Sequence, residues 1–188
     1  MSILNPSSRA LSMLSGITAI STLVVFGLEL NKSNIPQNLT TWVIWTVLNA
    51  LLLQASISAG NKDSWRLSAG ATAGVVLVTL ILLAKGEWHV GLVEMICIIG
   101  VLVSTIVWKL QGPKRGVVAI VVAMTLAGLP NMYDTFLAPS SESWFLWGGL
   151  TLACILAALS AEKWTIEDRL YPVTLGIFNF IMLVLVFL

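Results

Sequence analysis

Charged side chains are scarce in this chain of 188 residues: they make up 10% of it, against 57% for hydrophobic residues. Soluble domains contain about 25% charged residues, so this composition excludes an ordinary soluble protein. The mean hydropathy is +0.93, and the charges lie in short clusters between long apolar runs, which indicates an integral membrane protein. The formal net charge is only +1, and no basic patch suits a nucleic acid partner.

Cysteine and histidine are also scarce, with two cysteines and one histidine in the whole sequence. Cys97 and Cys154 fall inside apolar runs, so we expect no structural disulfide, and no metal-ligand spacing is present. His-Glu-x-x-His, Gly-x-Ser-x-Gly, a phosphate-binding glycine loop and paired intramembrane aspartates are all missing. The last apolar run has no lysine that could hold retinal. We therefore expect no enzyme, no metal and no other cofactor.

Seven apolar runs are long enough to cross the hydrocarbon core as helices, which takes about 20 residues each. We place these spans near 10–29, 40–60, 67–85, 89–109, 115–136, 143–161 and 169–188. No small-x-small cleavage pattern follows the first run, so we expect it to remain as an uncleaved span. The spans predict an all-α membrane protein with one transmembrane domain over residues 1–188.

The basic residues in the connections predict an orientation. The N-terminal side would hold Arg9, Lys62, Arg66, Lys109, Lys114, Arg115, Lys163 and Arg169, and the other side Lys32 and Lys85. Cytoplasmic loops are the richer in lysine and arginine. We therefore expect the N-terminus in the cytoplasm, the C-terminus outside, and the cell membrane as the location. The loop at 136–143, which carries Glu142 and no basic residue, fits an outer loop.

An internal repeat runs through the chain at an offset of 102 residues. The identical pairs are Trp42 and Trp144, Trp45 and Trp147, Leu48 and Leu150, Ala55 and Ala157, Ser58 and Ser160, Ala59 and Ala161, Thr72 and Thr174, and Gly74 and Gly176. The tryptophan pairs are the most informative because tryptophan is rare. The matches predict two parallel three-helix repeats, 10–85 and 115–188, joined by a linker helix at 89–109, a plan found in transporters built from two halves.

This three-one-three plan resembles the superfamily of PQ-loop proteins, SWEET proteins and nicotinamide-riboside transporters. The closest local match is Leu129-Pro130-Asn131-Met132-Tyr133, followed by Ser141-Glu142-Ser143-Trp144 and Trp147. The resemblance implies a facilitator or uniporter for a small polar solute such as a sugar, nucleoside or vitamin, working by alternating access in the bilayer. It also implies a substrate role for Asn179, whose counterpart at the 102-residue offset is Leu77.

Aromatic and polar residues recur along the second and sixth spans. At 100° per residue, one stripe holds Trp42, Trp45, Asn49, Leu53 and Ser56, and the matching stripe holds Trp144, Trp147, Thr151, Ile155 and Ala158. Planar solutes bind by stacking on aromatic rings plus a few hydrogen bonds. We expect Trp42 and Trp144 to be interfacial anchors. The predicted substrate-binding residues are Trp45, Asn49, Trp147, Thr151 and Asn179, although Asn49 could equally join helices.

Two further residues inside the spans carry functional expectations. Pro130 breaks the backbone hydrogen bonding of the fifth span and is the predicted hinge, whereas Pro172 is expected in the first turn of the seventh. Glu94 is the only acid clearly inside a span, which makes it a candidate for proton coupling. As an alternative, Glu94 would pair with His89.

A second function fits the same sequence: a non-transporting receptor or assembly partner of the same fold. A polar, open centre between the halves would favour transport, whereas a dry centre packed with apolar side chains would favour the receptor. The expected partners are a small polar solute and the lipid bilayer, and both a monomer and a homo-oligomer are compatible with the sequence.

Overall fold

The computed structural model of the chain describes residues 6–32, 37–60, 65–85, 88–137, 139, 143–161 and 165–188. For five of these residues it describes only the main chain: Pro6, Pro130, Asp134, Ile166 and Glu167. Within these residues the chain forms seven helices. They are α1 (Pro6–Lys32), α2 (Leu39–Ser58), α3 (Trp65–Leu82), α4 (Leu92–Gln111), α5 (Pro113–Leu137), α6 (Trp144–Ser160) and α7 (Ile166–Leu185). The predicted all-α class is confirmed. Lys62, Glu142 and Lys163, which entered the orientation prediction, lie outside the described residues.

Every helix end lies within four residues of the predicted span end. Capping side chains account for two of the observed starts. The side chain of Asn38 accepts a hydrogen bond from the main-chain N–H of Thr40 (3.0 Å) and begins α2, and Thr165 accepts one from Asp168 (3.3 Å) and begins α7. Because α7 begins before Asp168, Pro172 lies inside the helix, and the expectation that it occupies the first turn is wrong.

Six helices, α1 to α5 and α7, are long and apolar enough to cross a membrane, and α6 is a shorter apolar helix of 17 residues. Large apolar side chains are exposed on the outside of the bundle, most densely along α4, which is the least buried of the six. Helices satisfy their own backbone hydrogen bonds and so can expose such surfaces to lipid. The described helices therefore fit an integral membrane protein.

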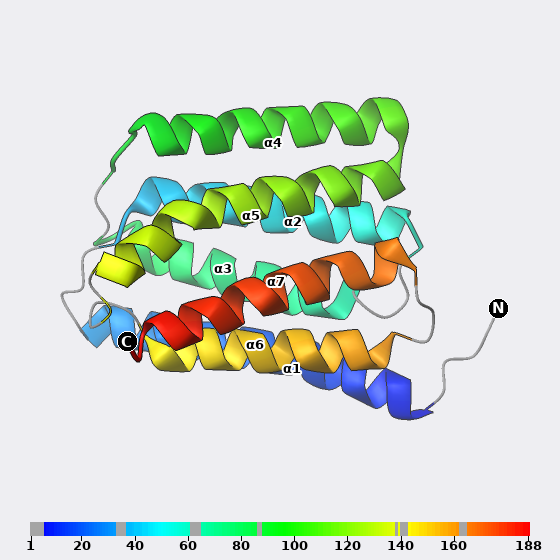
Figure 1. Cartoon of the computed structure of the whole chain (residues 1–188), viewed down its shortest axis with the longest axis horizontal. Helices are drawn as coiled ribbons and strands as arrows, with labels where there is room; N and C mark the ends of the chain where they lie inside the picture. The colour runs from blue at the N-terminus through cyan, green and yellow to red at the C-terminus, as the bar shows by residue number, and fades with distance from the viewer. Residues whose placement is uncertain are drawn as a thin grey trace.

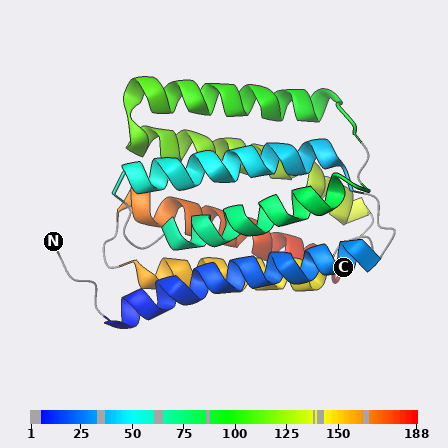
Figure 2. The same cartoon turned by 180° about the vertical axis from the view of Figure 1, so that it is seen from behind.

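The helices form two layers of three with α4 at one edge. In Figure 1, α5, α7 and α6 lie in front, and in Figure 2, seen from behind, α2, α3 and α1 lie in front. Within the layers α3 packs on α1 and α2, and α7 packs on α5 and α6. Between the layers α1 packs on α6 and α2 on α5, while α4 packs on α5 and α2. α1 begins and α7 ends at opposite ends of the bundle (Figure 1).

Glycines set the closest contacts between helices. A methyl group on Gly70 of α3 would overlap the carbonyl oxygen of Gly16 of α1, and one on Gly149 of α6 would overlap Thr22 of α1. Small residues let membrane helices approach closely, where dispersion and short hydrogen bonds hold them. α1 is thereby held tightly against both α3 and α6.

Candidate functional site

A cavity of about 560 Å³ lies between the two layers, and all seven helices contribute to its wall. This volume is in the range of small-molecule sites, which usually combine apolar walls with a few placed polar groups. The apolar part of the wall includes tryptophan rings and aliphatic side chains. The polar contribution comes from Gln37, Asn38, Thr41, Asn49, His89, Glu94, Asn131 and Asn179.

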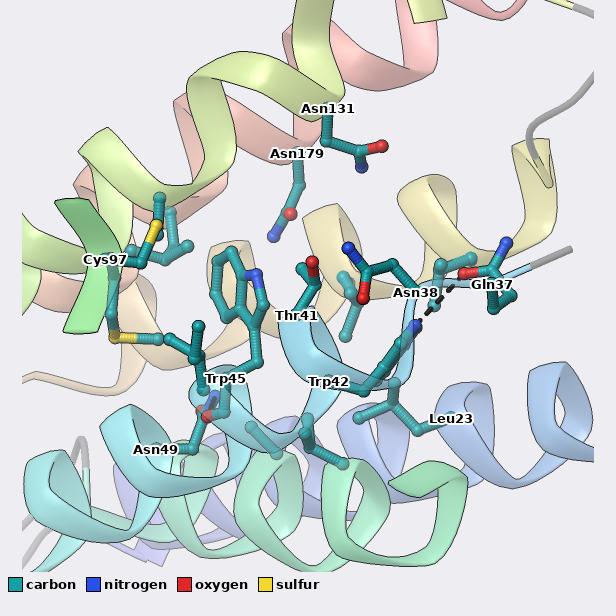
Figure 3. Close-up of a pocket in the computed structure, with 18 of the residues that line it drawn as sticks. Leu23, Gln37, Asn38, Thr41, Trp42, Trp45, Asn49, Cys97, Asn131 and Asn179 are labelled. Atoms are coloured by element: carbon teal, nitrogen blue, oxygen red, sulfur yellow. Dashed lines mark hydrogen bonds between the residues drawn. The ribbon is translucent and has the colours of Figure 1, made fainter. Parts of the chain in front are cut away.

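Three tryptophans line the cavity: Trp42 and Trp45 from α2 and Trp147 from α6. The ring of Trp42 stacks on Phe26 at 5.6 Å between centroids, and its indole N–H donates to Gln37 (3.0 Å). Trp147 meets Phe178 edge to face at 6.1 Å. These contacts fix the rings of Trp42 and Trp147, while Trp45 projects into the cavity (Figure 3).

Amide side chains gather around the same space. Figure 3 shows Asn131 of α5 and Asn179 of α7 on the side of the cavity opposite α2, with Asn179 pointing towards Trp45 and Thr41. Asn179 is buried, and its amide nitrogen donates to the sulfur of Cys154 (3.7 Å). An amide offers both donors and acceptors, so this wall suits a solute that carries its own hydrogen-bonding groups.

Four of the five predicted substrate-binding residues line the cavity together: Trp45, Asn49, Trp147 and Asn179. The fifth, Thr151, is buried outside the lining, and its hydroxyl donates to the main-chain carbonyl of Trp147 (2.7 Å). Asn49 makes the equivalent bond to the carbonyl of Trp45 (2.8 Å). The amide of Asn49, from the first half of the chain, therefore lines the cavity, whereas its counterpart in the second half, Thr151, does not.

The two predicted stripes do not face the cavity equally. Trp144 is 58% exposed and Ile155 is also exposed, so the α6 face towards the cavity is instead Leu146, Trp147, Leu150 and Cys154. On α2 the first three residues of the predicted stripe, Trp42, Trp45 and Asn49, all line the cavity. α6 packs on both α1 and α7, and this packing rotates Trp144 and Ile155 away from the centre of the bundle.

α3 and α7 face the cavity two residues out of step with the sequence repeat. The lining residues are Leu67, Ala71 and Val75 on α3 and Tyr171, Leu175 and Asn179 on α7. On α3, the lining position that corresponds to Asn179 is therefore Val75. The 102-residue offset of the sequence would instead pair Asn179 with Leu77. Gly74 contacts Leu23 of α1, whereas Gly176 faces Cys154 of α6, so this glycine pair does not share one environment.

Glu94, the proton-coupling candidate, lines the cavity near the start of α4 and is 8% exposed. One carboxylate oxygen accepts a hydrogen bond from the amide of Asn38 (2.7 Å) and the other accepts from the main-chain N–H of Gly91 (2.8 Å). The carboxylate thus caps α4 and reaches across to the cap of α2. Its hydrogen-bond partners among the described residues are these two, and it makes no ion pair with His89.

The cavity reaches one end of the bundle and stops short of the other. At the end where α2 and α4 begin, which we call the mouth end, its lining includes Gln37 and the exposed His89. Towards the opposite end it stops at Leu67 and Tyr171, both buried. Pro130, the predicted hinge, lies on a continuous α5 one residue before the lining residue Asn131.

No protein-family model, curated protein or solved structure matches the chain. Among the described residues no group of three or more histidine, cysteine or acidic side chains could hold a metal. The wall offers aromatic faces, neutral amides and one carboxylate, which together can bind and orient a solute.

Proposed function

We propose that this chain is a membrane transporter for a small polar solute, such as a sugar, nucleoside or vitamin, and that the solute passes through the central cavity. The cavity supports this proposal: a space of about 560 Å³ at the meeting point of all seven helices, with a mainly apolar wall that also carries amide, hydroxyl and carboxylate groups. A receptor or assembly partner with a vestigial site would be expected to have a dry, packed centre. Facilitated diffusion is the proposed mode. In a proton-coupled mode, the alternative, Glu94 would be the residue that carries the proton.

The pattern of helix contacts supports a two-repeat architecture related to the PQ-loop and SWEET plan. Exchanging α1, α2 and α3 with α5, α6 and α7 turns each contact within one layer into a contact within the other. The same exchange turns the contact of α1 with α6 into that of α5 with α2. A shift of 102 residues also carries the last residue of α2, Ser58, onto the last of α6, Ser160. Two halves related in this way could rock about the cavity.

The charge distribution supports an outward-facing mouth. The described basic residues at the end opposite the mouth are Arg9, Arg66, Lys109, Lys114, Arg115 and Arg169. By the positive-inside bias that end belongs in the cytoplasm. The cavity would then open to the outside and be closed towards the cytoplasm by Leu67 and Tyr171, which is one of the two states that alternating access requires.

A thermal-shift screen of the detergent-purified protein against sugars, nucleosides, vitamins and amino acids tests the site. A ligand at 100 times its Kd stabilises the folded protein by about 2.7 kcal/mol. We expect a concentration-dependent shift that Trp45→Ala and Trp147→Ala abolish. Trp144→Ala is the matched control, because Trp144 lies three residues from Trp147 on the same helix but is exposed, and it should keep the shift.

Uptake of the same ligand into proteoliposomes then separates transport from reception. Flux that saturates with concentration and falls in Trp45→Ala and Trp147→Ala supports the transporter. A ligand that binds through these residues without any flux would instead establish the receptor. If a ligand binds equally well to both variants, the central cavity is the wrong site.

A further inference from the structure

Glu94 brings a carboxylate into the cavity wall, where its hydrogen-bond partners are neutral groups and the imidazole of His89 lies nearby without an ion pair to it. The Glu94 side chain is only 8% exposed. Its two carboxylate oxygens accept hydrogen bonds from neutral donors, the amide of Asn38 and the main-chain N–H of Gly91. Neither lysine nor arginine occurs among the described residues that line the cavity. A buried carboxylate is costly unless it is paired, so an incoming cation would be stabilised here.

The carboxylate is held in place by the fold. Asn38 uses its oxygen to accept from the N–H of Thr40 as the cap of α2, and its nitrogen to donate to Glu94. The same carboxylate caps α4 through Gly91. Two helix starts at the mouth end therefore fix Glu94 in one orientation, which is the preorganisation that a binding group needs.

Aromatic rings stand in the same cavity as this charge. Trp42, Trp45 and Trp147 line it, and the ring of Trp42 is held by its stacking on Phe26. The face of a tryptophan ring attracts cations through its quadrupole, and such contacts strengthen when the site is desolvated. A carboxylate together with tryptophan faces is a combination suited to amines, quaternary ammonium groups and aromatic cations.

We infer that the solute is an organic cation whose positive charge is balanced by Glu94 and whose body lies against the tryptophans. The inference rests on the proposed transport function and narrows its substrate class. The asparagines of the wall, Asn131 and Asn179, would bind the neutral polar groups of the same molecule. Glu94 is thereby the residue that selects a charged solute over a neutral one of equal shape.

Matched probe pairs test this inference. We would measure binding of choline against 3,3-dimethyl-1-butanol and of 1-methylnicotinamide against nicotinamide, because each pair differs mainly in charge. The readout is thermal stabilisation of the full chain in detergent. In wild type at least one cation should bind tighter than its neutral partner by about tenfold to thirtyfold, the range of a desolvated cation–aromatic contact aided by a counter-charge.

Glu94→Gln keeps the shape and an oxygen acceptor for Asn38 but removes the charge, so the ratio within each pair should fall to about one. Glu29→Gln is the control, because Glu29 is an exposed carboxylate near the end of α1 that lies outside the cavity lining, and the preference for cations should persist. The comparison of cationic with neutral probes in the wild-type protein needs no variant. It therefore tests whether the site prefers cations even if Glu94→Gln unfolds.

Neutral probes that bind as tightly as the cations in wild type would overturn the inference, and so would a preference that survives in Glu94→Gln. Either result, with saturable flux of a neutral solute, would leave the proposed transport intact. The converse, a cation preference that depends on Glu94 without any flux of the cation, would establish the cation site and refute the transporter.

Discussion

Asn49 and Thr151, which are 102 residues apart, make the same hydrogen bond in the two halves of the chain. Each side chain donates to the main-chain carbonyl of the tryptophan four residues before it, Trp45 at 2.8 Å and Trp147 at 2.7 Å. Asn49 lines the cavity, whereas Thr151 lies outside the lining. The repeat in the sequence therefore preserves a local bond while the cavity uses one copy of it.

Substitution of these two residues should separate binding from local structure. Asn49→Ala removes a hydrogen-bonding group from the cavity, and a net loss of about 0.5–1.5 kcal/mol would weaken ligand binding about twofold to twelvefold. Thr151→Val keeps the shape of the side chain and should leave ligand binding unchanged. Titration of ligand-induced thermal stabilisation in both variants measures this, and equal weakening would show that Thr151 also contacts the solute.

The contact between α1 and α3 should be intolerant of any side chain at Gly70. Gly70→Ala would place a methyl group on the backbone of Gly16, which cannot rotate away, so the helices must separate. Overpacking of this kind costs about 1–3 kcal/mol. Gly148→Ala is the control, because its methyl group would meet Leu183 at 3.7 Å, an ordinary contact distance. The thermal unfolding midpoint should fall for Gly70→Ala alone, and an unchanged midpoint would contradict the close packing.

The two cysteines report on access to the cavity. Both line it, but Cys97 lies on α4 and is half-buried, whereas Cys154 is buried and its sulfur accepts a hydrogen bond from Asn179. In Cys154→Ala, a membrane-impermeant thiol reagent added from outside the cell should label Cys97. In Cys97→Ala, labelling of Cys154 should be much slower. Labelling of Cys97 only from the cytoplasmic side would reverse the proposed orientation.

Pro130 should control movement rather than binding. Pro130→Ala restores the N–H that proline lacks and stabilises a straight α5 by up to about 3 kcal/mol. Half of this added to the barrier would slow flux about tenfold, with ligand affinity unchanged. Pro113→Ala is the matched control, because Pro113 begins α5, where the missing N–H costs nothing. Unaltered flux in Pro130→Ala would remove the hinge from the mechanism.

The sequence predicts how deep a residue lies along its helix better than it predicts which face of the helix the residue occupies. Trp45, Asn49, Trp147 and Asn179 meet in the cavity because deep polar and aromatic groups in a short bundle have few other places to lie. Asn38 was missed as a site residue because it lies between spans. A capping signal was available in Asn38-Leu39-Thr40 at the start of an apolar run, but its second bond to Glu94 joins residues 56 positions apart.

Hydrophobic length by itself determined the seven helices, and their ends to within four residues, since a backbone in lipid must satisfy its own hydrogen bonds and an apolar run of sufficient length can do so only as a helix. Only the tertiary structure decided how each helix is rotated about its axis. The helices are apolar on nearly all sides, so periodicity does not mark an inner face. Close contacts such as Gly16 with Gly70 and Thr22 with Gly149 set those rotations instead. They turn Trp42 into the cavity and Trp144 out of it, and they place Glu94 beside Asn38.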